Sequence, residues 1–186
     1  MKRIILLLCT LELCSCANFN KTYPSVKEEC EVAGPNSREC HIYNLKDYTE
    51  LEKEGSLATL YLFGAGNVPY DYEKAYYWFS KLAKLNNAEA ENSLGIIYFL
   101  GLGRDKNIKK AEYYYLKAID GGEKREAKIN LAELYRLNGD NGYLGDYDKS
   151  EKWYLEGVKE NPYRAYDGLS KLFFPKKNIK SLMSMH

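Results

Sequence analysis

Histidine is almost absent from this chain of 186 residues, and its scarcity limits the chemistry that the chain can carry. The two histidines, His41 and His186, lie far apart in the sequence. Histidine is the most frequent general base of enzymes and a common zinc ligand. No G-x-S-x-G motif for an active-site nucleophile occurs either. The sequence therefore predicts a protein that is not an enzyme and that needs no cofactor and no metal.

An excess of one charge is also lacking. Lysine and arginine number 27 against 26 aspartates and glutamates, which gives a formal net charge of +1. Lys2, Arg3 and Glu12 lie close to the N-terminus, so the charges of residues 16–186 balance. Proteins that bind nucleic acid usually carry a basic excess. The composition thus gives no indication of a nucleic-acid partner.

Long hydrophobic runs are missing as well. The apolar stretch from Ile4 to Leu13 is interrupted by Thr10 and Glu12, and it is much shorter than the ~20 residues of a membrane-spanning helix. A short apolar stretch that follows two cations, here Lys2 and Arg3, is typical of a signal peptide. We therefore assign residues 1–15 to a signal peptide.

The chain does contain a repeat. Two apolar positions recur every 37 residues (94−57 and 131−94): Leu57, Leu94 and Leu131, and Tyr61, Tyr98 and Tyr135. Such a period, with two helix-sized apolar segments in each unit, indicates stacked helix-turn-helix units. A fourth unit begins with Ala165, Leu169 and Phe173 but stays partial. The predicted fold is all-α, a right-handed α/α solenoid of about three repeats plus a partial fourth over residues 44–174.

The repeat has a recognisable motif, A-x3-LG-x2-Y-x2-G-x-G followed by KA-x2-W/Y. The second unit matches it best, with Ala90, Leu94, Gly95, Tyr98, Gly101, Gly103, Lys110, Ala111 and Tyr114. This pattern resembles the Sel1-like repeat family, a relative of the tetratricopeptide repeats. The resemblance implies a binding protein. Some members of the family have been linked to β-lactam binding or hydrolysis, so a hydrolase of β-lactam-like or cell-wall ligands is the enzymatic alternative; the cysteine pairs of those subfamilies are missing here.

The end of the predicted signal peptide, Leu13-Cys14-Ser15-Cys16, resembles the bacterial lipobox. The resemblance implies that Cys16 carries the lipid and becomes the N-terminus. It also implies delivery to the outer membrane, facing the periplasm, because Ala17 replaces the aspartate that retains lipoproteins at the inner membrane. Glu12 departs from the pattern, and the alternative is an ordinary signal peptide that is cleaved nearby.

Two cysteines remain after the signal peptide and the lipid site, Cys30 and Cys40. In a compartment that permits oxidation, an even pair predicts a disulfide. We expect this disulfide to staple a cap onto the first repeat, within a tether and cap over residues 16–43. Residues 17–29 are polar without helical periodicity and are predicted to be the tether. A redox couple is the functional alternative, although such couples usually have closer spacing.

Several helix boundaries can also be predicted. Asn44 and Asp47 suit the N-terminus of the first inner helix, which should run to Phe63 and end at glycines that accept a positive φ. A variant capping box, Asp148-x-x-Glu151, suits the start of the third outer helix. The basic tail over residues 175–186 is expected to cap the open end of the solenoid.

The inner helices offer a candidate binding groove. At 100° per residue, a buried Leu94 brings Ile97 inward but points Ile96 and Phe99 elsewhere. Such residues either pack against neighbouring repeats or line the concave surface where repeat proteins bind. The predicted partner-binding residues are Thr59, Leu62, Asn92, Ile96, Phe99, Glu133 and Arg136.

The predicted partner is a secreted or envelope protein. Sel1-like lipoproteins resemble immunity proteins that inhibit periplasm-acting phospholipase toxins, and this resemblance gives the sharper hypothesis. The alternative is a structural or regulatory adaptor in envelope assembly. Both hypotheses place the protein in the cell envelope, anchored by the lipid on Cys16.

Overall fold

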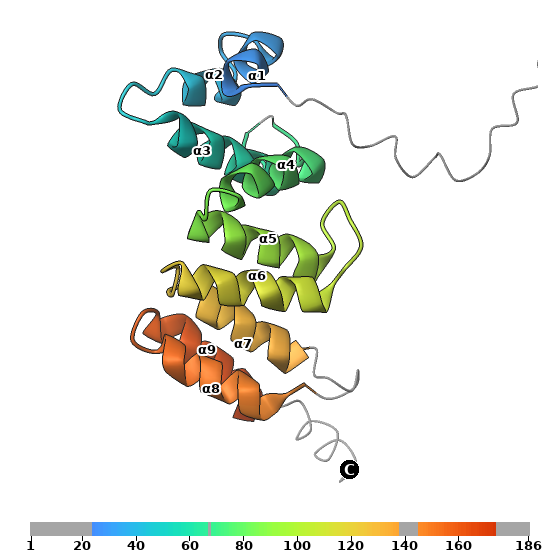
Figure 1. Ribbon diagram of the computed structural model, residues 1–186, viewed down its shortest axis with the longest axis vertical. Coiled ribbons are helices and arrows are strands. Elements are labelled where there is room, and N and C mark those ends of the chain that lie inside the picture. The colour runs from blue at the N-terminus through green and yellow to red at the C-terminus, as the bar shows by residue number, and fades with distance from the viewer. Residues whose placement is uncertain (1–23, 67, 138–144, 174–186) are drawn as a thin grey trace, which may run out of the picture.

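The computed structural model describes residues 24–66, 68–137 and 145–173, and these residues form an elongated stack of nine helices (Figure 1). The helices are α1 (Val26–Ala33), α2 (Arg38–Tyr43), α3 (Glu50–Phe63), α4 (Tyr72–Ala83), α5 (Ala88–Leu100), α6 (Ile108–Asp120), α7 (Ala127–Leu137), α8 (Tyr147–Gly157) and α9 (Pro162–Phe173). Each helix packs mainly against its neighbours in sequence. The predicted all-α repeat solenoid is confirmed.

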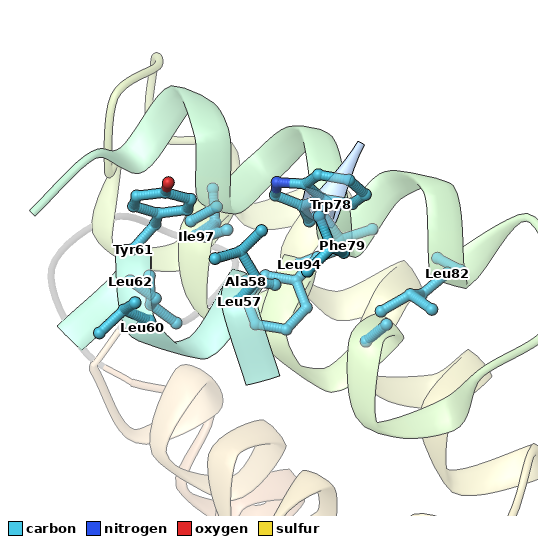
Figure 2. Close-up of a cluster of buried hydrophobic side chains, with 14 residues drawn as sticks. Leu57, Ala58, Leu60, Tyr61, Leu62, Trp78, Phe79, Leu82, Leu94 and Ile97 are labelled. Carbon is cyan, nitrogen blue, oxygen red and sulfur yellow. The ribbon is translucent and has the colours of Figure 1, made fainter. Parts of the chain in front are cut away.

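Three helical hairpins make up the complete repeats: α3–α4 is unit 1, α5–α6 is unit 2 and α7–α8 is unit 3. The inner helices α3, α5 and α7 carry Leu57, Leu94 and Leu131, which are all buried. Figure 2 shows how the core continues from one unit to the next: Trp78 and Phe79 of α4 lie beside α3, and Leu94 and Ile97 of α5 enter the same cluster. No unit encloses its apolar side chains alone, so stacking is required for stability.

The repeat motif has a direct structural meaning. In each complete unit the lysine at the start of the outer helix lies over the ring of the inner-helix tyrosine. The ammonium-to-centroid distances are 4.7 Å for Lys74 and Tyr61, 4.9 Å for Lys110 and Tyr98, and 5.2 Å for Lys149 and Tyr135. These cation–π contacts explain why the pattern keeps a lysine and a tyrosine at fixed places.

The hydroxyl groups of the same three tyrosines connect each unit to the one before it. Tyr61 donates to Glu29 of α1, and Tyr135 donates to Glu112 of α6. Between them, the hydroxyls of Tyr98 and Tyr76 are 3.1 Å apart. The N-terminal helix α1 therefore takes the place that an outer helix takes further along the solenoid.

The N-terminal cap consists of α1 and α2, joined by the predicted disulfide between Cys30 and Cys40, with 4.2 Å between their Cα atoms. The predicted tether over residues 17–29 was wrong for its C-terminal part, because Ser25 begins a helix. Its side chain accepts from the backbone of Glu28, and the Glu28 carboxylate accepts from the backbone of Ser25. The buried face of α1 consists of Val26, Glu29 and Cys30, and the charged Glu29 interrupts its apolar pattern, so the sequence did not reveal this helix.

Two predicted helix starts were also wrong. Thr49 and Glu52, rather than Asn44 and Asp47, form the capping box of α3, because Asn44 already ends α2. Helix α8 is capped by Asp146 in place of the predicted Asp148 and Glu151. The Asp146 side chain accepts from the backbone N–H of Lys149.

Capping by an aspartate or asparagine three residues before the motif lysine recurs in all three outer helices. Asp71 accepts from the backbone of Lys74, and Asn107 accepts from that of Lys110. Such side chains satisfy N–H groups that a helix start leaves without a partner. The inner helices α3 and α5 end as predicted: Gly64 has a φ of 66° and Gly101 a φ of 73°, both in the region that favours glycine.

Candidate protein-binding face

An open hollow of about 680 Å³ lies between the first two inner helices. Its walls come from α3 and α5, and Phe79 and Leu82 of α4 also line it. Small residues line it from both inner helices: Gly55, Ser56 and Thr59 on α3, and Ala90 and Ser93 on α5. We call this surface the α3–α5 hollow. It exists because neighbouring inner helices carry small side chains where they face each other.

The hydroxyl groups in the hollow are held by their own helices. Ser56 donates to the carbonyl of Glu52 at 2.8 Å, Thr59 to Gly55 at 2.9 Å and Ser93 to Glu89 at 2.9 Å. Each hydroxyl oxygen still has lone pairs that can accept a hydrogen bond. The hollow therefore offers acceptors to a partner.

Exposed apolar residues and acidic residues also line the hollow. Tyr48 and Leu51 are 46% and 49% exposed, which is large for such side chains in a folded protein. Asp47, Glu52 and Glu89 also line it, whereas no lysine or arginine does so among the residues that the structure describes. A hydrogen bond from the Thr49 backbone lowers the pKa of Glu52, which keeps this carboxylate charged. The hollow thus favours partners with apolar and cationic side chains.

The predicted groove residues have different environments. Thr59 is exposed and lines the hollow. Ile96 is half-buried against the core of unit 2. The expected exposure was wrong for Leu62, Asn92 and Phe99, which are all buried. The helical period gave their direction correctly, but the adjacent repeat lies close enough to cover them.

Two of these buried side chains have clear structural partners. Phe99 belongs to the same core cluster as Leu131 and Leu134 of α7. The amide of Asn130, also on α7, donates to the side-chain oxygen of Asn92 at 2.9 Å. Both residues therefore connect unit 2 to unit 3.

Glu133 and Arg136 form an ion pair within α7, at 2.5 Å. The Tyr154 hydroxyl of α8 donates to the same Glu133 carboxylate. Burial raises the pKa of Glu133, but the hydrogen bonds from Arg136 and Tyr154 outweigh it and lower the pKa below its usual value. These two residues connect the helices of unit 3, while Thr59 faces the hollow between units 1 and 2.

The sequence missed the residues that shape the hollow, above all Ser56 and Ser93. A signal was available, since small residues recur at helical spacing on α3 and α5. The apolar pattern drew attention to large side chains, whereas a hollow forms where side chains are small.

Several predicted features lie outside the described residues. They are the signal peptide, the lipid site Cys16 and the tail over residues 175–186. Over the described ranges, no helix combines the length and the apolar character needed to cross a membrane. No group of three or more metal-ligating side chains occurs in this part of the chain either.

Comparison with protein families gives three matches to the Sel1 repeat model, at residues 56–87, 88–123 and 125–162. These segments coincide closely with units 1, 2 and 3. No curated protein matches the chain significantly.

Several solved structures are similar to this chain, including the following two. One is c5321, a protective antigen present in uropathogenic Escherichia coli strains, which displays an SLR fold; it is 27% identical with a TM-score of 0.58 over 74% of this chain. The other is a Sel1 repeat protein from Oxalobacter formigenes, 26% identical with a TM-score of 0.48 over 66% of this chain. The present chain spans 28% and 46% of these two proteins, respectively.

Proposed function

Because this chain belongs to the Sel1 repeat family, whose members are generally protein-interaction scaffolds, we propose that it binds another protein through the α3–α5 hollow. The observation that carries the proposal is the hollow itself, an open surface lined by small, exposed apolar and acidic residues. The proposed occupant is a segment of the partner with lysine or arginine beside apolar residues. Binding of this kind requires no catalysis.

The proposal places the protein in the cell envelope. Residues 1–15 would direct export, and Cys16 would carry the lipid that anchors the protein to the outer membrane, facing the periplasm. The disulfide between Cys30 and Cys40 supports this location, because such bonds form and persist in oxidising compartments. Several acyl chains give firm attachment, since each buried methylene contributes about 0.8 kcal/mol.

The sharper form of the proposal is an immunity function, in which the partner is a periplasm-acting phospholipase toxin. It is supported by the resemblance of the N-terminus and the repeats to lipoproteins that inhibit such toxins. Anchoring at the membrane would hold the inhibitor where a phospholipase attacks.

The hollow can be tested by filling it. Thr59→Arg together with Ser93→Arg adds two long cationic side chains to an acidic surface without touching the core. The matched control is Leu155→Arg, because Leu155 lies on the outer helix α8 and is 54% exposed. Residues 17–186 of each variant would be used to capture partners from an envelope and secreted-protein extract. We expect the double variant to lose the partner and the control to keep it, while the helical circular dichroism of both stays unchanged. Equal capture by the two variants would refute the α3–α5 hollow as the binding site.

The captured protein decides between the finer functions. A single stoichiometric partner with phospholipase activity that the chain inhibits would support immunity. An envelope-assembly component would support the adaptor function instead. Anchoring is tested separately with Cys16→Ser, which should move the protein from the membrane to the soluble fraction.

A further inference from the structure

The three lysine–tyrosine pairs of the repeat differ in their charge balance. In unit 1 the Glu29 carboxylate accepts from both Tyr61 and Lys74, each at 2.7 Å. In unit 3 the hydroxyl of Tyr135 donates to the carboxylate of Glu112. Each of these pairs therefore has a negative charge beside it.

Unit 2 lacks that carboxylate. Tyr76 follows Lys74 by two residues, as Glu112 follows Lys110, so a neutral phenol takes the place of an acid. Its hydroxyl lies 3.1 Å from that of Tyr98. The Tyr98 ring also stacks on that of Tyr114, with 5.6 Å between centroids. Three tyrosines thus meet where the neighbouring units have a carboxylate.

Unit 2 also has an additional cation at this place, Arg104. The carbon of its guanidinium group lies 3.1 Å from the centroid of the Tyr76 ring and 5.7 Å from that of Tyr98. The preceding turn brings it there, because Gly103 has a φ of 65° and packs so closely on Tyr72 that a Cβ atom would lie 2.8 Å from the Tyr72 Cβ. A larger residue would push the turn, and the arginine with it, away from α4.

Neither cation of this cluster has an anionic partner among the described side chains. The equivalent lysines do: Lys74 pairs with Glu29 at 2.7 Å and Lys149 with Asp146 at 2.9 Å. The Nε atom of Arg104 is buried and has no hydrogen-bond acceptor within the described residues. Protein atoms cover Nε, so an anion would meet the other N–H groups of Arg104 and the ammonium of Lys110. Two cations without a carboxylate beside them favour an additional anion.

The tyrosines of this cluster differ: the pKa of Tyr76 is lowered, whereas burial and the hydrogen bond with Tyr76 raise the pKa of Tyr98 to about 12. Burial raises the pKa of Tyr76, but the hydrogen bond with Tyr98, the nearby Ser80 side chain and the charges of Arg104 and Lys110 outweigh it and lower the pKa below its usual value. The Tyr76 hydroxyl is therefore a good hydrogen-bond donor to an anion.

We propose that Arg104 and Lys110, with the hydroxyls of Tyr76 and Tyr98, form a binding site for a phosphate group. The two hydroxyls share one hydrogen bond, so the proton of only one of them is free for an anion. Two cations and this hydroxyl donor suit the charge and the several oxygens of phosphate better than a single carboxylate. The site shares no residue with the α3–α5 hollow and does not depend on the proposed function. The phosphate group comes from free phosphate or from a lipid headgroup, and the experiment separates these sources.

The test uses residues 17–186, which keep every described residue. Inorganic phosphate would be titrated by calorimetry at low ionic strength, and co-sedimentation would be measured with phosphatidylglycerol vesicles. We expect Arg104→Gln with Lys110→Gln to weaken binding by about tenfold or more, because each removes a charge-assisted hydrogen bond. The matched control is Lys109→Gln, which alters an exposed lysine next to Lys110 and should leave binding unchanged.

A second variant tests the site without removing a cation. Tyr76→Glu gives unit 2 the carboxylate that Glu112 supplies to unit 3, so it should abolish phosphate binding while the melting temperature is maintained. If inorganic phosphate binds wild type and Lys109→Gln but not the site variants, the ligand is a free anion. If only the vesicles show this difference, the ligand is a lipid headgroup. Binding that is absent, or that is equal in wild type and both variants, would overturn the proposal.

Discussion

Replacing Lys74 by methionine should destabilise the junction between the N-terminal cap and unit 1. The Glu29 side chain is 3% exposed, and its Oε2 atom accepts from Lys74 and Tyr61 at 2.7 Å each. Methionine keeps most of the length of the lysine side chain but leaves the carboxylate with Tyr61 as its remaining donor. An isolated charge in this environment is costly because water cannot reach it.

The expected loss in the free energy of unfolding is about 3 kcal/mol, the lower part of the range for breaking a buried ion pair, since Lys74 itself is 29% exposed. For a chain of this length, that loss corresponds to a decrease of about 6–12 °C in melting temperature. Urea unfolding followed by circular dichroism would give the free energy. The fluorescence of the buried Trp78 would show whether unit 1 opens first.

Two comparisons isolate the cause. Lys110→Met changes the same motif position in unit 2, where no carboxylate of the described residues pairs with the lysine. It should lower the free energy of unfolding by less than about 1 kcal/mol, because a cation–π contact is lost. Adding Glu29→Gln to Lys74→Met should restore about 2 kcal/mol, because no charge is then left unpaired. If Lys74→Met and Lys110→Met are equally destabilising, the Glu29 carboxylate is not responsible and the reasoning is wrong.

Three further changes can be predicted. Leu94→Ala should lower the free energy of unfolding, measured in urea, by about 3–4 kcal/mol. Leu94 is 1% exposed, and the cavity that the substitution leaves between units 1 and 2 cannot collapse fully. Cys40→Ser should cost about 2–3 kcal/mol by loosening the cap, and reducing agent should lower the melting temperature of wild type but not of this variant. Glu133→Gln should cost about 1 kcal/mol near pH 7. The folded-state pKa of Glu133 is lowered, so its contribution to stability is fully present above the unfolded pKa of about 4.3 and is lost as the pH falls through the folded pKa. The melting temperatures of wild type and Glu133→Gln should therefore converge in acid.

The sequence alone determined the architecture of this protein. The period of 37 residues placed Leu57, Leu94 and Leu131 in the core, and the motif glycines marked where α3 and α5 end. The disulfide followed from an even pair of cysteines. Such features are local or repeat at a fixed interval, so one chain contains the information needed to find them.

Only the tertiary structure decided how deeply each side chain is buried. A helical period gives the direction of Leu62 or Phe99, but their burial depends on how closely the next repeat approaches. The same limit explains why the small residues of the hollow were missed. The distance between inner helices is set by packing across units, which no single helix encodes.

Charge pairing also depends on the assembled structure. Glu54, Glu91 and Lys128 occupy the same place in successive units, and each pairs with an opposite charge on its outer helix or just beyond it: Lys81, Lys117 and Glu160. In unit 3 the inner helix supplies the cation and its partner supplies the anion, the reverse of units 1 and 2. The ion pair is kept because both residues have exchanged their charges. Which carboxylate meets which cation follows from how the units stack, and this stacking leaves Arg104 and Lys110 without an anion on the described part of the surface.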